Sequence, residues 1–487
     1  MQAKQSLLLV ILVLAVLGAT TVLVRLQGAP AGARDDAWSR VPRHVAAVDH
    51  SRFFPEPFAD GRAVTRACLE CHREEAADFM HTAHWKWTGD PVTVPGHAEP
   101  VAIGKKNLIN NFCISVQTNW PKCTSCHAGY GWSDQDFDFD DASGIDCLVC
   151  HDQSGTYRKG ASGEPAAGVD LLASARSVGL PDRTNCGVCH FNGGGGDAVK
   201  HGDLDQTMYF PTRDIDVHMG GLGLECIDCH HAQEHRIPGR SMSVSVNDKA
   251  GIGCTDCHRE APHESERLNA HVSALACQSC HIPEFAVREA TKMYWDWSQA
   301  GQDLPITDPH EYLKIKGRFR YERDVVPEYY WYDGTADRYL KGDRFDPAEV
   351  LSLNRPHGDI RESEARIWPF KVHRGKQIYD TENQYLLIPK AVGPGGYWTD
   401  FDWDEALTLA APVTGLAYSG HYGWARTAMY WPLSHMVAPK ERALQCVDCH
   451  GPGGRMDWKA LGYAGDPYEV GGRNRERLLS EKGGSAR

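Results

Sequence analysis

A mainly α-helical fold with much irregular backbone is predicted for this chain of 487 residues, and two observations support the prediction. The pentapeptide Cys-x-x-Cys-His occurs eight times, and seven copies lie between Cys68 and His281. Glycine- and proline-rich segments separate the helical patterns, and strand patterns are weak throughout. Each pentapeptide is typical of a c-type haem attachment site, in which two thioethers hold the porphyrin and the histidine binds the iron. The residues between Cys68 and His281 are too few to build a side-chain core around seven porphyrins. We therefore expect a multihaem cytochrome c with a haem-packed core.

The attachment motifs account for 16 of the 17 cysteines. The predicted haem-bearing cysteines are Cys68, Cys71, Cys123, Cys126, Cys147, Cys150, Cys186, Cys189, Cys226, Cys229, Cys254, Cys257, Cys277, Cys280, Cys446 and Cys449. The predicted proximal iron ligands are His72, His127, His151, His190, His230, His258, His281 and His450. Cys113 alone remains, so no disulfide framework is expected, even though the compartment should be oxidising.

Residues 1–27 are interpreted as an export signal or an N-terminal membrane anchor. Lys4 precedes an apolar run from Leu7 to Val24, which Arg25 follows. The run is long for a signal core and just long enough to span a bilayer, so both alternatives stay open. Because haem is attached outside the cytoplasm, we expect the rest of the chain in the periplasm or another extracytoplasmic compartment, either soluble or tethered by this segment.

Four further regions follow the N-terminal segment. Residues 28–60 are expected to form a linker and an N-terminal arm, and residues 61–290 a haem-rich region with seven motifs. Residues 291–430 hold no motif and are rich in aromatic side chains, which we expect to pack on the haems. Residues 431–487 carry the eighth motif and a tail. The helices predicted within these regions cover Ala67–Trp85, Pro262–Cys277, Asp404–Ala410 and Ala425–Val447.

The formal net charge of −13 makes a nucleic-acid partner improbable. An anionic substrate would need a local group of cations, for which Lys105 and Lys106 are candidates. The acidic run Asp134–Asp141 could hold a structural calcium ion through its oxygens, although it lacks a recognised loop spacing.

Low-spin electron-transfer haems need a second imidazole, and 16 of the 24 histidines lie outside the motifs. Their positions relative to the motifs favour seven of them as distal ligands: His84, His218, His235, His263, His271, His373 and His435. Four further histidines are reserve candidates: His50, His81, His201 and His231.

The second motif, Cys123–His127, has unusual neighbours. Cys113 is a free thiol ten residues before it, and as a thiolate it could attack a sulfur–sulfur bond. Lys200 follows the glycine run Gly193–Gly196, which lets the backbone approach a flat cofactor. As an iron ligand Lys200 must be neutral, and Asp197 could orient its amine or relay protons.

At Asn110–Ile114, Cys123–Trp132 and Cys189–Asp203 the chain resembles the octahaem tetrathionate reductase family of c-type cytochromes. The resemblance extends through Pro369–Lys376, His435–His450 and Gly454–Trp458. It implies a fold related to the hydroxylamine oxidoreductase and nitrite reductase type of multihaem proteins, with seven bis-histidine haems. It also implies that the second haem is the active site, with Lys200 as its distal ligand and Asn110, Cys113 and Asp197 beside it.

These observations predict a periplasmic octahaem reductase that splits tetrathionate to two thiosulfates, with nitrite and hydroxylamine as further candidate substrates. A donor cytochrome or a quinol-linked membrane protein is the expected electron source. The chain lacks the Cys-x-x-Cys-Lys motif of nitrite reductases and the widely spaced cysteine pair of octahaem sulfite reductases. The alternative is a non-catalytic electron conduit, which needs only the chain of haems.

Overall fold

The computed structural model describes residues 49–239 and 251–473, so the N-terminal signal or anchor predicted at residues 1–27 lies outside the described residues. The chain divides into two compact units. The larger comprises Val45–Ile252 and His263–Arg487, and the smaller comprises Met1–His44 and Gly253–Pro262. In the smaller unit, the short helix η7 (Cys254–Asp256) carries the sixth attachment motif. Among the described residues, no helix is both long and apolar enough to cross a membrane.

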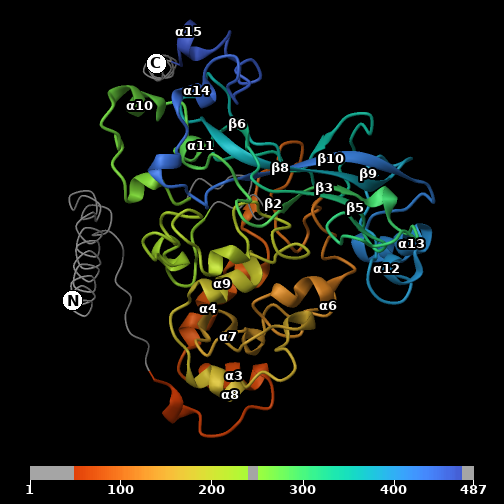
Figure 1. Ribbon diagram of the computed structural model, residues 1–487. Coiled ribbons are helices and arrows are strands. Elements are labelled where there is room, and N and C mark those ends of the chain that lie inside the picture. Colours follow the sequence, from red (N-terminus) through yellow and green to blue (C-terminus); the bar gives the residue numbers. More distant parts are fainter. Residues whose placement is uncertain (1–48, 240–250, 474–487) are drawn as a thin grey trace, which may run out of the picture. The chain divides into compact units, whose positions relative to one another are not determined.

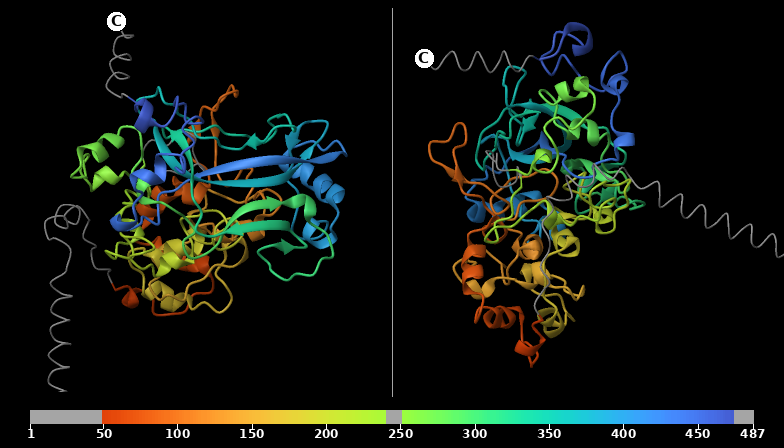
Figure 2. Two further views of the ribbon diagram at one scale, coloured as in Figure 1. Left: turned by 45° about the horizontal axis from the view of Figure 1, so that its top comes forward. Right: turned by 90° about the vertical axis from the view of Figure 1, so that its left-hand side faces the viewer.

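An eight-stranded sheet organises the larger unit. Its main path runs β4-β5-β3-β8-β10-β7, and β6 and β9 pair with other parts of β8. The strands are β3 (Thr291–Asp296), β4 (Tyr312–Leu313), β5 (Gly317–Glu322), β6 (Glu328–Tyr332), β7 (Leu351–Ser352), β8 (Arg366–Asp380), β9 (Tyr385–Leu386) and β10 (Tyr422–Pro432). β8 and β10 pair antiparallel from Tyr422↔Asp380 to Pro432↔Phe370. Most helices of the haem-rich region gather on one side of this sheet (Figures 1 and 2).

The prediction of a mainly helical protein is wrong, since helices make up only 25% of the residues that the structure describes. The helix expected to begin at Ala425 is instead strand β10. β8 and β10 are buried on both faces along much of their length, so their side chains do not alternate between apolar and polar. The strand signal that remains is their content of aromatic and β-branched residues, a preference that depends on packing.

The helices are short, and a local signal sets many of their ends. The helix predicted over Ala67–Trp85 is broken into three, of which Asp60 caps the start of the first and Thr82 the start of the third. The helix predicted over Asp404–Ala410 is confirmed within α13, which Asp402 caps and Gly415 ends in the left-handed conformation. The α-helices are α3 (Gly61–Cys68), α4 (Arg73–Met80), α5 (Ala83–Lys86), α6 (Trp120–Cys123), α7 (Leu148–His151), α8 (Leu171–Arg176), α9 (Arg183–His190), α10 (Glu266–His271), α11 (Gln278–His281), α12 (Tyr397–Asp400), α13 (Trp403–Thr414), α14 (Cys446–Cys449) and α15 (Pro467–Val470).

A buried carboxylate ties the haem-rich region together. Asp146 is 2% exposed and accepts hydrogen bonds from the hydroxyls of Tyr130 (2.8 Å) and Tyr157 (2.9 Å). The ammonium of Lys159 also pairs with it, and the amide of Val149 donates to it at 3.0 Å. This network joins the segment that follows the second motif to the start of the third.

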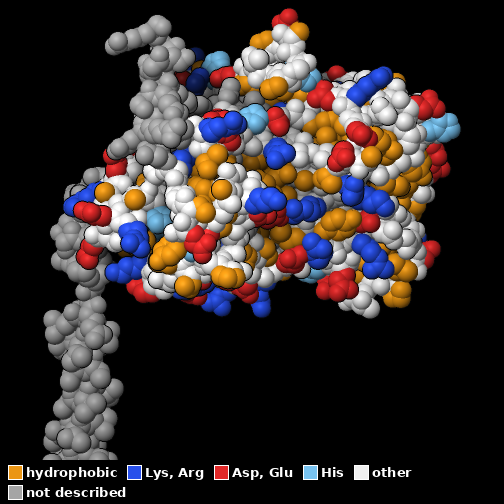
Figure 3. Space-filling model, turned by 90° about the horizontal axis from the view of Figure 1, so that it is seen from above, with side chains coloured by type: hydrophobic (Ala, Val, Ile, Leu, Met, Phe, Trp, Pro, Cys, Tyr) orange, Lys and Arg blue, Asp and Glu red, His pale blue; other side chains and the backbone are white. Residues whose placement is uncertain are grey.

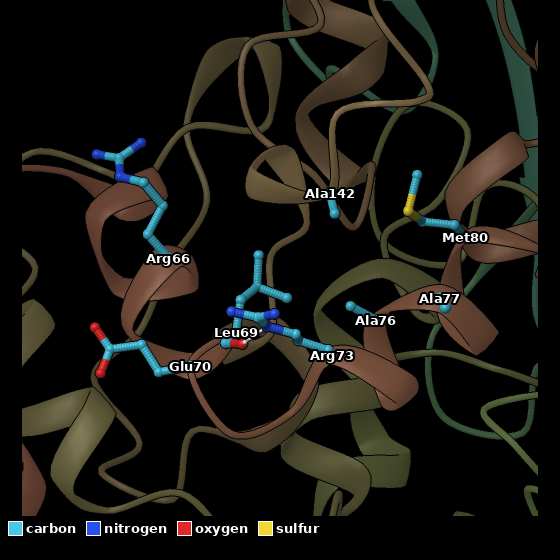
Figure 4. Close-up of a pocket in the computed structure, with 8 residues that line it drawn as sticks. All are labelled: Arg66, Leu69, Glu70, Arg73, Ala76, Ala77, Met80 and Ala142. Carbon is cyan, nitrogen blue, oxygen red and sulfur yellow. Dashed lines mark hydrogen bonds between the residues drawn. The ribbon is translucent and has the colours of Figure 1, made fainter.

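A cavity of about 400 Å³ lies beside the first motif rather than the second. Figure 4 shows Leu69, Ala76, Met80 and Ala142 around it, with Arg66 and Glu70 to one side. On the face drawn in Figure 3, acidic and basic side chains are interspersed with apolar ones, and neither sign of charge forms a continuous field.

Candidate active site at the second attachment motif

Six of the eight attachment histidines face a second imidazole. The separations of the ring centres are 6.3 Å for His72–His50, 6.4 Å for His151–His235, 6.1 Å for His190–His84, 6.2 Å for His230–His435, 6.1 Å for His281–His263 and 6.3 Å for His450–His271. A nitrogen roughly 2 Å from a central metal on each side, and about 1.1 Å from its own ring centre, gives about 6.3 Å. The paired cysteines and this spacing therefore fit c-type haem with two axial imidazoles.

The other ring nitrogen of several of these histidines holds the ring in place. Nδ1 of His151 donates to the carbonyl of Gly179 (2.8 Å), and Nδ1 of His230 donates to that of Pro238 (2.7 Å). A carbonyl can only accept, so the proton lies on Nδ1 and the lone pair of Nε2 is available to a metal.

Five of the seven predicted distal histidines lie in these pairs: His84, His235, His263, His271 and His435. His50, a reserve candidate, forms the sixth pair, although it lies 22 residues before His72 in the sequence, with helix α3 between them. The structure does not bring His373 to such a pair. Its ring is buried in β8, with Nδ1 3.1 Å from Oδ1 of Asn111. His218 follows Asp216, which caps its amide, and its ligand role stays a prediction.

His127 of the second motif is different. Its Nε2 lies 2.7 Å from the carbonyl oxygen of Trp85, and both residues are fully buried. The carbonyl must accept, so Nε2 carries the proton in this arrangement. On its other side the ring meets Gly129, where a Cβ would lie 2.9 Å from Nδ1. The role of His127 as an iron ligand stays a prediction.

Aromatic rings enclose His127. The ring centres lie 4.8–6.1 Å from that of the imidazole and belong to Trp85, Trp87, Trp132, Phe137 and Phe139. Burial lowers the pKa of His127 to about 3, so the ring is neutral.

The acidic run at Asp134–Asp141 supplies two of those aromatic rings, Phe137 and Phe139. Asp134 and Asp138 accept from nearby backbone amides, and Asp141 pairs with Arg62 at 2.5 Å. Across residues 49–239 and 251–473, no three histidine, cysteine or acidic side chains gather as a metal-ion site, so the structure gives the calcium prediction no support.

One face of the sheet carries the segment with Asn110 and Cys113. Gln377 on β8 donates to the carbonyl of Asn110 at 2.7 Å, and Lys292 on β3 donates to that of Phe112 at 3.3 Å. Oδ1 of Asn110 accepts from the amide of Cys113 at 2.8 Å. The peptide before Cys113 is therefore held at both ends, by Lys292 and by Asn110. No pattern in the sequence pointed to Lys292, because a lysine within an aromatic segment is usually a surface residue.

The glycine run packs directly against Cys113. Gly195 has φ +113°, and a Cβ there would lie 3.3 Å from Sγ of Cys113. Gly194 has φ +82°, and a Cβ there would lie 2.3 Å from the ring of Phe112. Glycine is thus required both for the backbone conformation and for the approach to the thiol.

Gly195→Ala is expected to lower turnover at the second motif about tenfold or more, because its methyl group presses on the Cys113 thiol. Gly196→Ala is the matched control. It carries the same kind of backbone strain, with φ +139°, but its Cβ would meet only Val199, at 3.8 Å. Viologen-linked turnover and the rate of Cys113 alkylation compare the two variants. Equal losses of turnover in the two variants would assign the effect to backbone strain. The contact with the Cys113 thiol would then have no part in it.

Lys200 and Asp197 follow on the same loop. Nζ of Lys200 lies 5.0 Å from the ring centre of Trp431, and burial lowers the pKa of Lys200 to about 7, helped by the charge of Lys105. Asp197 accepts from the amide of Gln206 at 2.9 Å, which ties its carboxylate to the following turn. Burial raises the pKa of Asp197. The amine of Lys200 loses its proton readily and is therefore suited to binding a metal.

The helical turn Gln206–Tyr209 is the basis for a predicted pH effect on stability. Asp205, 1% exposed, caps the turn, and burial raises its pKa to about 6, whereas an unfolded aspartate titrates near 4. The folded form therefore holds the proton more tightly, so its contribution is complete below pH 4 and is lost as the pH rises through about 6. At pH 7.5 the free energy of unfolding of Asp205→Asn should exceed that of the wild type by about 3 kcal/mol at most. At pH 4 the two proteins should be equally stable. Asp170→Asn, at an exposed cap of α8, is the control in circular dichroism melts, and a difference that does not change with pH would contradict the prediction.

Comparison with known proteins agrees with these features. A family model described as bacterial cytochrome c matches residues 292–453, and one for cytochrome c554 and c-prime matches residues 67–152. No curated protein matches the chain. The crystal structure of an octahaem cytochrome c from Shewanella oneidensis is 48% identical, with a TM-score of 0.82, over 87% of this chain and 98% of that one.

Near-complete coverage at this identity extends over both the attachment motifs and the sheet. Covalently bound haem c is therefore a cofactor of this protein, which works in electron transfer outside the cytoplasm. The chain belongs to the octahaem cytochromes c.

Proposed function

We propose that this octahaem cytochrome is a periplasmic reductase, that its substrate site is the second haem, and that Lys200 is a ligand of that iron together with His127. The observation that carries the proposal is that the glycine run brings Lys200 and Cys113 together. A Cβ at Gly194 would lie 3.4 Å from Cβ of Lys200, and one at Gly195 would lie 3.3 Å from Sγ of Cys113. Burial lowers the pKa of Lys200 to about 7, so its neutral amine could bind the iron and give way to a substrate.

The charges near this motif favour an anion. Lys105 lies over the ring of Trp87, 4.6 Å from its centre, and its charge acts on Lys200. Lys106 lies 4.1 Å from the ring centre of Phe139. Lys292 is buried behind Cys113. Against a net charge of −13, these cations form the local basic region that an oxoanion needs.

Tetrathionate is the substrate that the thiol favours. The Cys113 thiolate attacks an inner sulfur, the central sulfur–sulfur bond breaks, and one thiosulfate leaves. The cysteine then carries a mixed disulfide with the second thiosulfate. Two further electrons, which bound haem would supply one at a time, would reduce this disulfide to thiolate and thiosulfate. Asn110 and Lys292 hold the peptide before Cys113, so the thiol keeps one position throughout.

Nitrite and hydroxylamine are further candidates, because small nitrogen ligands could also take the place of the Lys200 amine on the iron and need no thiol. The alternative of a pure conduit makes a different spectroscopic prediction, so the two functions can be separated by experiment.

The test is the ligation of the second haem. We expect electron paramagnetic resonance to detect seven bis-histidine low-spin haems and one of another kind, and cyanide to bind one haem of eight. Reduced viologen should drive tetrathionate reduction by the same preparation. Eight bis-histidine haems, with no cyanide binding, would contradict the reductase and leave the conduit.

A further inference from the structure

The loop that carries Lys200 is held through all five of its consecutive carbonyl groups. The single hydroxyl hydrogen of Thr291 is shared between two carbonyls, since Oγ1 lies 2.6 Å from the oxygen of Ala198 and 3.1 Å from that of His201. The amide of Lys292 also donates to the carbonyl of Ala198, at 3.4 Å. The carbonyl of Gly202 accepts from the amide of Ala286 at 2.7 Å. A segment with every carbonyl engaged cannot shift without breaking several hydrogen bonds at once.

Lys371 holds the other two carbonyls. Its Nζ donates to the carbonyls of Val199 (3.0 Å) and Lys200 (3.2 Å), and to Oγ1 of Thr291 (2.6 Å). An ammonium has three N–H donors, and these three acceptors use all of them. Burial lowers the pKa of Lys371, whereas three acceptors around the nitrogen oppose that shift because they bond the charged form.

The surroundings of Lys371 are shaped for this contact. The side chain is fully buried on β8. Gly202 makes room for it, since a Cβ there would lie 3.2 Å from Cδ of Lys371 and 2.2 Å from the ring of Phe285. A buried lysine is expensive to keep, so a role in placing the loop gives a physical reason for its presence.

We propose that Lys371 is a positioning residue for Lys200: it fixes the backbone of the loop so that the Lys200 amine meets the second haem. This inference rests on the proposed ligation by Lys200. Without Lys371, two buried carbonyls would lose charge-assisted hydrogen bonds, and the loop would relax away from the position in which its amine can bind.

The sheet supplies a matched control. Lys292 is also a buried lysine, but it donates to the carbonyl of Phe112, before Cys113. Lys292→Met should therefore disturb the thiol and leave Lys200 in place, whereas Lys371→Met should do the reverse. The two variants remove the same charge from the same sheet.

The experiment uses the full haem-loaded protein in four forms: wild type, Lys371→Met, Lys292→Met and Lys200→Ala. Near-infrared magnetic circular dichroism reports the lysine-ligated haem, redox titration reports its potential, and haem content reports folding. We expect Lys371→Met to keep eight haems, to lose about half or more of the lysine signal, and to lower turnover of tetrathionate about tenfold with little change in KM. Lys292→Met should keep the signal.

The outcomes separate the inference from the proposed function. A spectrum unchanged in Lys200→Ala overturns the ligation itself. A signal lost in Lys200→Ala but fully kept in Lys371→Met, with unchanged potential, overturns the positioning role alone. If Lys371→Met loses haem, Thr291→Val, of nearly the same shape, removes one acceptor of Lys371 and the hydroxyl that the carbonyls of Ala198 and His201 share. An unchanged lysine signal in that variant likewise overturns the inference.

Discussion

Cys113→Ala is expected to lower tetrathionate reduction about a hundredfold or more while all eight haems stay attached. The thiol is half-buried and packs beside Ile114 and Trp295, and no other thiol lies outside the attachment motifs. Without it, no protein nucleophile is available to open the sulfur–sulfur bond. Viologen oxidation measured with tetrathionate gives kcat and KM for the variant and the wild type.

The control for this variant is Cys113→Ser, which keeps the size of the side chain but makes it a poor nucleophile. Cys113→Ser should lose as much tetrathionate turnover as Cys113→Ala, because the reaction needs a thiolate. Nitrite turnover in the same samples should change much less, since it does not use the thiol. Tetrathionate turnover at the wild-type rate in both variants would remove Cys113 from the mechanism and leave direct reduction at the haem.

The largest expected effect on stability belongs to Asp146. Asp146→Ala leaves the buried ammonium of Lys159 without its carboxylate and two tyrosine hydroxyls without their acceptor. Breaking a buried pair by removing one partner typically costs about 3–5 kcal/mol. Chemical denaturation followed by circular dichroism should therefore show a much lower midpoint, with the slope unchanged.

Asp146→Asn distinguishes charge from hydrogen bonding. The amide oxygen still accepts from a tyrosine but no longer balances Lys159, so we expect a loss smaller than that of Asp146→Ala. Equal midpoints for Asp146→Ala and the wild type would show that water or neighbouring groups satisfy Lys159.

The attachment motifs could be predicted, because each haem needs its own pair of cysteines and an imidazole within one short segment. Five of the seven histidines predicted as distal ligands face an attachment histidine in the structure, and their binding to iron stays a prediction. The sheet could not be predicted, because β8 and β10 are buried on both faces and show no alternation.

The site itself could be predicted only in part. Cys113 and Lys200 are distinctive by composition and by resemblance. The orientation of His127 depends on Trp85 and four other rings that only the fold brings together, and the motif alone does not reveal it. Lys371 acts through a strand about 170 residues from its target, so no local pattern connects the two.

The enclosure of His127 has a consequence for its contact with solvent. Its ring is fully buried, and the rings of Trp85, Trp87, Trp132, Phe137 and Phe139 surround it. The proton on Nε2 therefore exchanges with water only when this wall of aromatic rings opens. Its rate of hydrogen exchange would report how often the interior of the second site is exposed.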